Sequence, residues 1–310
     1  MGNRLDGKVA VVTGAGRGIG RAIAIAMAAE GAAVAVNDIG AGVDGSGRDL
    51  SAAEGTTAAI LAAGGRAMAN FADVSNYEAA QQMIEAAYTT FGRVDILVNN
   101  AGNLRDRMIF NMSEDEFDSV VAVHLKGAFN CTRHASVRMR RQHAGRIINI
   151  TSTSGLYGNS GQANYAAAKD GVVGLTRVVA RDLGKYAITV NAIAPAAMTR
   201  LAETIPADVV ARREAAGVKG AASIGGEFGR VSGFAPEDIA PFATYLATDE
   251  AAGINGQTFM VMGGLIALMN DPAPVRTITK AARWHADEIA AVFPSTLGLD
   301  LVNPVSREHE

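Results

Sequence analysis

The chain has 310 residues, of which 49% are hydrophobic and 19% charged, so it can bury a substantial core and is unlike a disordered protein. Its net charge of -3, without a basic block, gives no indication of a nucleic-acid or anionic-membrane partner. The first residues lack an apolar signal core, no apolar run reaches transmembrane length, and the one cysteine, Cys131, cannot form an internal disulfide; we therefore expect a cytoplasmic protein.

Short apolar strands alternate with longer helices along the chain. The predicted strands lie at residues 9–13, 33–37, 67–71, 94–99, 146–151, 188–193 and 257–261, and the predicted helices at 21–30, 51–63, 77–91, 114–141, 163–183 and 236–247. The strands are apolar throughout, so both faces of their sheet should be covered by helices. The expected fold is α/β, a Rossmann-type, doubly wound, parallel sheet of seven strands in a single domain over residues 1–265.

Three segments interrupt this alternation. Residues 40–50 (GAGVDGSGRDL) are rich in glycine and predict an exposed loop. Residues 201–234 follow the sixth strand at the ligand-binding edge, where we expect either a mobile lid or an ordinary surface loop. Residues 266–310 form a C-terminal extension, in which 281–292 predict an amphipathic helix carrying Trp284. That helix is either a plain surface helix or one that packs on a neighbouring subunit or borders the substrate entrance.

A glycine-rich turn, GAGRGIG at residues 14–20, joins the first strand to the first helix. Such a turn has physical meaning in this context because the helix N-terminus offers unpaired N–H groups to a phosphate. Gly14 can adopt backbone angles forbidden to other residues, Gly16 lets a pyrophosphate approach the main chain, and Gly20 allows close helix–strand packing. With Arg17, Gly18 and Ile19, these residues predict a dinucleotide site.

Asp38 lies at the end of the second strand, 18 residues after Gly20. A carboxylate there accepts hydrogen bonds from the adenosine ribose hydroxyls and repels a 2′-phosphate, which favours NAD over NADP. Arg17 argues in the other direction, because a guanidinium in the turn could bind a 2′-phosphate. We give Asp38 more weight, since no second basic residue follows it at Ile39 or Gly40.

Polar and small residues also follow the third and fourth strands. Asp73 and Val74 should lie near the adenine, and Asn100, Ala101 and Gly102 should line the adenosine side. Each alone is equally consistent with a turn at a strand end. Together they fall at the carboxyl ends of consecutive strands, where sheets of this kind bind ligands.

Ser152, Tyr165 and Lys169 predict a catalytic group. Tyr165 and Lys169 are four residues apart on a predicted helix, so they share a face, and Ser152 ends the fifth strand. A free tyrosine titrates near 10, too high for an efficient base at neutral pH. We expect the ammonium of Lys169 and a positive nicotinamide ring to lower the Tyr165 pKa, with Ser152 binding the substrate oxygen.

With these motifs the chain resembles the short-chain dehydrogenase/reductase family over about residues 5–265. The matching stretches are residues 13–20, Asn99–Gly102, Ser152 with Tyr165–Lys169, and Asn191–Pro195. The resemblance implies that Asn100, Ile193, Pro195, Ala196, Met198 and Thr199 border the cofactor. Two residues depart from the pattern: Ala196 replaces the usual glycine after the proline, and His124 stands where a helix asparagine commonly completes a catalytic tetrad through a water. His124 is either a fourth catalytic residue or a satisfied helix histidine facing the core.

Further segments resemble the (3R)-hydroxyacyl-CoA dehydrogenase domain of the peroxisomal multifunctional β-oxidation enzyme, a branch that also has histidine at the tetrad position. They are residues 36–40, 104–107, 123–127 and 157–165. This resemblance implies NAD-dependent oxidation of a (3R)-hydroxyacyl-CoA or a related steroid alcohol. Five arginines could bind CoA phosphates or be solvated surface charges: Arg105, Arg107, Arg200, Arg212 and Arg213.

Two alternatives remain open: a 3-oxoacyl carrier-protein reductase that works in the opposite direction with NADPH, and a non-catalytic nucleotide-binding protein. Asp38 opposes the first, and the presence of both Tyr165 and Lys169 opposes the second. By family resemblance we also expect a homodimer or homotetramer, with helices 114–141 and 163–183 facing their symmetry mates. The five histidines are scattered without metal-ligand spacing, so no metal site is expected.

Overall fold

The computed structural model describes residues 3–196 and 235–301. Its strands are β1 (Val9–Thr13), β2 (Ala33–Asn37), β3 (Arg66–Asn70), β4 (Ile96–Asn99), β5 (Gly145–Ile150), β6 (Ile188–Pro195), β7 (Thr258–Met262) and β8 (Leu265–Leu268). They form one sheet in the order β3-β2-β1-β4-β5-β6-β7-β8, in which β1 to β7 are parallel. The predicted parallel, doubly wound sheet is thereby confirmed.

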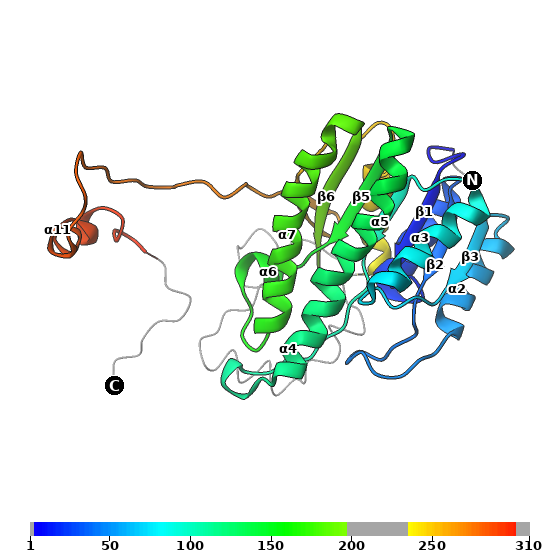
Figure 1. Ribbon diagram of the computed structural model, residues 1–310, viewed down its shortest axis with the longest axis horizontal. Coiled ribbons are helices and arrows are strands. Elements are labelled where there is room, and N and C mark those ends of the chain that lie inside the picture. Colours follow the sequence, from blue (N-terminus) through cyan, green and yellow to red (C-terminus); the bar gives the residue numbers. More distant parts are fainter. Residues whose placement is uncertain (1–2, 197–234, 302–310) are drawn as a thin grey trace.

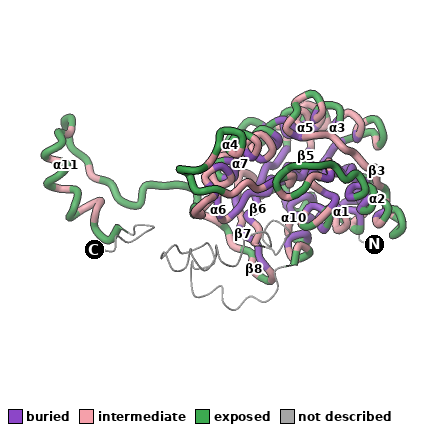
Figure 2. Tube along the Cα trace, turned by 90° about the horizontal axis from the view of Figure 1, so that it is seen from below, coloured by how far each residue is buried: buried purple, intermediate pink, exposed green. Residues whose placement is uncertain are grey.

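The helices are α1 (Gly18–Ala29), α2 (Ser51–Ala62), α3 (Tyr77–Phe91), α4 (Glu114–Val121), α5 (Gly127–Gln142), α6 (Thr153–Tyr157), α7 (Ala163–Leu183), α10 (Ala240–Leu246) and α11 (Ala286–Val292). Helices α1, α2 and α10 pack on one face of the sheet, and α3, α5 and α7 on the other. Successive strand residues point to opposite faces: Ala10 and Val12 belong to the first core, and Val11 to the second. Figure 2 shows the buried strands between these two layers.

The expected count of seven strands is wrong: the described residues contain an eighth, β8, which pairs antiparallel with β7. Gly263 has φ +46° and, with Gly264, turns the chain back so that Val261 pairs with Ile266. Apolar residues along β8 are alternately half-buried and exposed, as on an edge strand. In the sequence, four residues with this alternation are too few to distinguish an edge strand from a tail that leaves the sheet.

The long helix predicted at 114–141 is interrupted. Helix α4 begins with a capping box between Ser113 and Glu116, and a π-helical turn at Ala122–Lys126 then separates it from α5. A π-helical turn inserts an extra residue into the helix and is frequent at functional sites. This turn holds His124, which is 4% exposed.

Beyond β8, the chain runs as an extended arm away from the sheet, and α11 lies at the far end of it (Figure 1). The helix is shorter than predicted, because the N–H of His285 donates to the Glu288 carboxylate at 2.9 Å and the first turn begins at Ala286. Trp284 therefore precedes the helix and contacts Lys280, whose Nζ lies 5.6 Å from the indole centroid.

Cys131 lies on α5 within the core between α3, α5 and the sheet, and it is fully buried. Burial raises the pKa of its thiol to about 12. The thiol therefore packs as a small apolar side chain and is not an activated nucleophile.

Candidate active site

A cavity of about 720 Å³ opens at the carboxyl ends of the strands, beside β1 and β4 where the strand order reverses. Open α/β sheets bind ligands at such a switch point. Most of the predicted site residues line it: Gly14, Arg17, Gly18, Ile19, Asp38, Asp73, Val74, Asn100, Ala101, Gly102, His124, Ser152, Tyr165, Lys169, Pro195 and Ala196. Met198 and Thr199 lie outside the described residues, as do Arg200, Arg212, Arg213 and the expected lid at 201–234. Ile193 is buried in β6 and is not among the lining residues.

The turn between β1 and α1 is held tightly against the end of β4. Gly14 and Gly18 have φ values of +62° and +55°, which side chains disfavour. The Asn100 amide donates to the carbonyl oxygens of Thr13 and Gly14 at 2.9 and 3.0 Å. No side chain caps the N-terminus of α1, so its first N–H groups remain available to a ligand. The cradle therefore fits a nucleotide pyrophosphate.

Gly16 does not line the cavity, although the sequence suggested close approach of a pyrophosphate at this position. A Cβ atom there would lie 2.7 Å from the Ala52 Cβ and 2.8 Å from the Asp38 Oδ2. The missing side chain makes room for α2 and for Asp38.

The carboxylate of Asp38 is fixed at the end of β2. Its Oδ2 accepts from the Gly16 N–H at 2.9 Å, and its Oδ1 accepts from the Gly40 N–H at 2.7 Å. Each oxygen has a further lone pair, so the carboxylate can still accept from ribose hydroxyls. Arg17, the residue that argued for NADP, forms an ion pair with Asp49.

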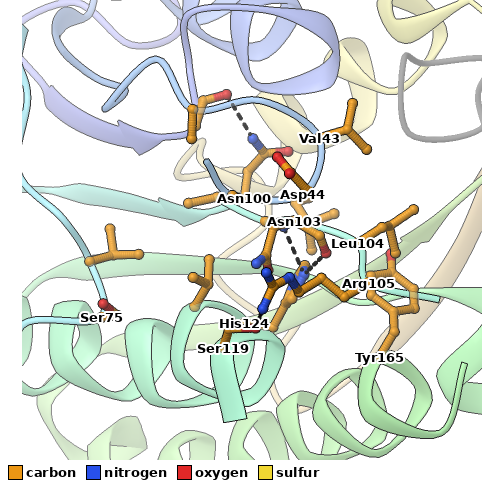
Figure 3. Close-up of a pocket in the computed structure, with 18 of the residues that line it drawn as sticks. Val43, Asp44, Ser75, Asn100, Asn103, Leu104, Arg105, Ser119, His124 and Tyr165 are labelled. Atoms are coloured by element: carbon orange, nitrogen blue, oxygen red, sulfur yellow. Dashed lines mark hydrogen bonds between the residues drawn. The ribbon is translucent and has the colours of Figure 1, made fainter. Parts of the chain in front are cut away.

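The 40–50 loop is part of the site, which the sequence did not reveal. Val43, Asp44, Gly45 and Ser46 line the cavity, and the Leu104 N–H donates to the Val43 carbonyl oxygen at 2.8 Å. This bond joins the loop to the segment after β4, and Figure 3 shows Val43 and Asp44 close to Asn103, Leu104 and Arg105. Glycine-rich composition indicates a loop, but a hydrogen bond between residues 61 positions apart leaves no local pattern in the sequence.

The three predicted catalytic residues come together on one side of the cavity. Ser152 follows β5 and caps α6, its Oγ accepting from the Ser154 N–H at 3.1 Å. Tyr165 and Lys169 are one turn apart on α7, and the Lys169 Nζ lies 5.6 Å from the Tyr165 ring centroid. The Ser152 side chain is close enough to the Tyr165 hydroxyl to lower its pKa. The Lys169 Nζ also donates to the Ile150 carbonyl oxygen at 2.6 Å.

The expected effect of Lys169 on Tyr165 is wrong for the protein by itself. Burial raises the pKa of Tyr165 to about 12, the Ser152 side chain opposes this rise, and the negative charge of Asp106 adds to it. Burial also lowers the pKa of Lys169 to about 7, so this amine carries only part of a charge at neutral pH. Spacing alone predicted the proximity of the two side chains but not the loss of hydration that governs their charges.

The titration of Lys169 predicts a pH dependence of stability. Between about pH 7 and 10, Lys169 is mostly neutral in the folded protein and protonated in the unfolded chain, so the unfolding free energy should rise with pH. Lys169→Met should flatten this rise, as measured by urea unfolding at a series of pH values. Replacing the exposed Lys126 by Met is the matched control and should preserve it. Equal slopes for wild type and Lys169→Met would contradict a depressed Lys169 pKa.

His124 contacts both the loop after β4 and the catalytic tyrosine. Its Nε2 lies 2.7 Å from the Asn103 carbonyl oxygen, and its ring meets that of Tyr165 edge-on with centroids 5.0 Å apart. A Cβ atom on Gly102 would lie 2.3 Å from the His124 Cε1. Burial, and secondarily the charge of Lys169, hold the His124 pKa well below its usual value, so the imidazole is neutral. Its buried Nδ1 has no hydrogen-bond partner among the described residues.

Two of the candidate phosphate-binding arginines pair with carboxylates. Arg105 forms an ion pair with Asp115, and Arg107 with Glu116 at 3.0 Å. Only Arg105 of the two lines the cavity. No group of three or more histidine, cysteine or acidic side chains in residues 3–196 and 235–301 could hold a metal ion. None of the described helices is long and apolar enough to span a membrane.

A family model described as short chain dehydrogenase matches residues 8–209. A 3-oxoacyl-acyl-carrier-protein reductase of Synechocystis is 41% identical over 265 residues, covering 84% of this chain and 98% of that protein. A hydroxyacyl-CoA dehydrogenase of Mycobacterium tuberculosis is 39% identical over 298 residues, covering 93% of this chain and 88% of that protein. The peroxisomal hydratase-dehydrogenase-epimerase of Neurospora crassa is 41% identical over 265 residues, which are 85% of this chain and 27% of that protein. The chain thus spans about a quarter of this multifunctional relative.

The crystal structure of a short chain dehydrogenase from Mycobacterium avium has a TM-score of 0.79 and 43% identity, with 96% of each chain covered. The family model covers well over half of the chain, and the sheet, the glycine-rich turn and the Ser-Tyr-Lys group are arranged around one cavity. This chain therefore belongs to the short-chain dehydrogenase/reductase family and is an oxidoreductase that acts on CH–OH groups.

Proposed function

We propose that the chain oxidises a (3R)-3-hydroxyacyl-CoA, or a related hydroxysteroid, with NAD⁺ as hydride acceptor. The observation that carries this proposal is one continuous cavity with Asp38 among its lining residues and Ser152, Tyr165 and Lys169 together in its wall. The Mycobacterium tuberculosis relative named as a hydroxyacyl-CoA dehydrogenase supports the acyl-CoA substrate class, because the match includes 88% of its length.

Each residue has a role that its position supports. Asp38 accepts hydrogen bonds from the adenosine ribose, and the N–H groups of Gly18 and Ile19 at the start of α1 bind the pyrophosphate. Lys169 holds the nicotinamide ribose, and Ser152 donates to the substrate oxygen. Bound NAD⁺ supplies the hydride acceptor and a positive charge.

Tyr165 takes the proton from the substrate hydroxyl. Because burial raises its pKa to about 12, the phenolate needs positive charge in the cavity to form at neutral pH. The neutral His124 packs against the Tyr165 ring and holds it between Ser152 and Lys169. We therefore assign His124 as a positioning residue.

The second candidate is a 3-oxoacyl carrier-protein reductase, which the Synechocystis relative supports because the match covers 98% of it. One screen tests both: NAD⁺ reduction with 3-hydroxyacyl-CoAs and with steroid alcohols, alongside NADPH oxidation with 3-oxoacyl thioesters. Turnover of 3-hydroxyacyl-CoA or steroid alcohol with NAD⁺ supports the proposal. Turnover confined to 3-oxoacyl thioesters with NADPH would replace it with the second candidate, and no turnover with cofactor bound would favour a non-catalytic nucleotide-binding protein.

We also propose that the protein is a homodimer or homotetramer. Exposed apolar side chains on α4, α5 and α7 support this: Phe117 on α4, Phe129 on α5 and Val178 on α7 are 37%, 47% and 56% exposed. Sedimentation velocity at working concentration should give a dimer or tetramer, whereas a single monomeric species would refute the proposal.

A further inference from the structure

Arg17 lines the cavity, and its guanidinium forms an ion pair with Asp49, which is not among the lining residues. The ion pair joins Arg17, in the turn before α1, to Asp49, near the end of the 40–50 loop. Both side chains are partly exposed, at 36% for Arg17 and 47% for Asp49.

Several backbone and side-chain bonds fix Asp49 in place. Its N–H donates to the Gly40 carbonyl oxygen at 3.0 Å, its own carbonyl oxygen accepts from the Ala52 N–H at 3.2 Å, and its Oδ1 accepts from both the N–H and hydroxyl of Ser51. Gly40 has φ +72°, and a Cβ atom there would lie 2.0 Å from the Asp49 carbonyl oxygen. The loop can therefore close only with glycine at position 40.

The same loop connects Asp49 to Asp38. The Gly40 N–H donates to the Asp38 Oδ1 at 2.7 Å, and the Gly40 carbonyl oxygen accepts from the Asp49 N–H. Hydrogen bonds from Ser51, together with the charge of Arg17, hold the pKa of Asp49 below its usual value, so Asp49 is an anion at neutral pH. The loop thus connects two carboxylates: Asp38 at the end of β2, and Asp49, which forms the ion pair with Arg17 in the turn before α1.

A 2′-phosphate is recognised by guanidinium groups, because their fork of N–H donors matches phosphate oxygens. Arg17 is such a group at this turn, next to Gly16, whose N–H already binds Asp38. We propose that Asp49 is a second determinant of the preference for NAD: it engages the guanidinium of Arg17, which is then not available to a 2′-phosphate. This inference rests on the proposed use of NAD and adds a residue to its specificity.

The effect of Asp49 on 2′-phosphate binding should depend on whether Asp38 is charged. While Asp38 is charged, it repels a 2′-phosphate whatever Arg17 does, so Asp49→Asn alone should change little. In an Asp38→Asn background, releasing Arg17 should tighten binding of the 2′-phosphorylated nucleotide by about fivefold, the upper range for an exposed ion pair.

The experiment is calorimetric titration of the whole protein with two adenosine ligands that differ only in the 2′-phosphate: 5′-AMP and adenosine 2′,5′-bisphosphate. Two pairs of variants are compared. The first pair is Asp38→Asn with and without Asp49→Asn. The second pair is the same two variants with Arg17→Ala added to each. We expect about fivefold tighter bisphosphate binding in the first pair, no gain for 5′-AMP, and no gain in the pair that lacks Arg17. Asp38→Ser is the second neutral background if Asp38→Asn does not fold.

Glu54→Gln is the matched control. It removes one negative charge from the first turn of α2, directly after the same loop, but Glu54 is exposed, does not line the cavity and is not the partner of Arg17. No Asp49 effect, an effect that persists without Arg17, or an equal effect of Glu54→Gln would each overturn the inference, the last two by showing simple charge repulsion. Failure of the wild type to bind NAD⁺ would instead overturn the proposed function itself.

Discussion

Replacing Tyr165 with phenylalanine should lower kcat by roughly 10²- to 10⁴-fold, the range in which a positioned proton-transfer group contributes. The change removes only the hydroxyl, whose pKa Ser152 lowers, and keeps the ring that packs edge-on against His124. Folding and NAD⁺ binding should therefore change little. Steady-state kinetics of NAD⁺ reduction and calorimetric titration of NAD⁺ measure the two quantities separately.

Tyr157→Phe is the matched control for this variant. Tyr157 is 41% exposed at the end of α6, does not line the cavity, and its hydroxyl contacts only the Met269 sulfur at 3.9 Å among the bonds of the described residues. Its loss should leave kcat near the wild-type value. Wild-type kcat in Tyr165→Phe, or loss of NAD⁺ binding together with activity, would contradict the assignment of Tyr165 as the proton-transfer residue.

Gly20→Ala should have the largest effect on the cofactor site. The new Cβ would lie 2.3 Å from the Gly14 carbonyl oxygen and 2.4 Å from the Asn100 Nδ2, so backbone on the turn has to shift. Overpacking of this kind destabilises a protein by about 1–3 kcal/mol. Because the same shift displaces the N–H groups of the turn, we expect NAD⁺ affinity to fall by about tenfold or more, a loss of at least about 1.4 kcal/mol.

Urea unfolding and NAD⁺ titration measure both effects, and Gly55→Ala provides the comparison. Gly55 is exposed within α2, and a Cβ there meets nothing within 4 Å. Alanine should stabilise that helix by about 0.5–1 kcal/mol and leave NAD⁺ binding unchanged. If Gly20→Ala matched the wild type in stability and NAD⁺ affinity, the prediction that the turn needs glycine at position 20 would be contradicted.

The parallel, doubly wound sheet could be predicted from the sequence because strands and helices alternate along the chain, which favours parallel pairing and right-handed crossovers. The antiparallel β8 could not, since four residues after a glycine pair give too little periodicity. The π-helical turn at Ala122–Lys126 was also missed: an inserted residue shifts the helical phase but leaves every residue type compatible with an α-helix.

Within the site, motifs of fixed spacing predicted which residues come together, as Ser152, Tyr165 and Lys169 illustrate. Two properties depend on distant parts of the chain and could not be predicted. The Arg17–Asp49 ion pair depends on how a glycine-rich loop closes. The raised pKa of Tyr165 depends on how completely water is excluded around it, and the expected lowering by Lys169 and a nicotinamide ring did not include this loss of hydration.

Because Cys131 is buried, the native protein should not react with thiol reagents. With a pKa of about 12, almost none of this thiol is thiolate at neutral pH, and its sulfur lies inside the core. Since the chain has one cysteine, a second one placed on the exposed loop, for example by Arg48→Cys, would be the sole position to take up a maleimide dye. The loop beside the nucleotide cavity can thus carry a fluorescent reporter without any cysteine being removed first.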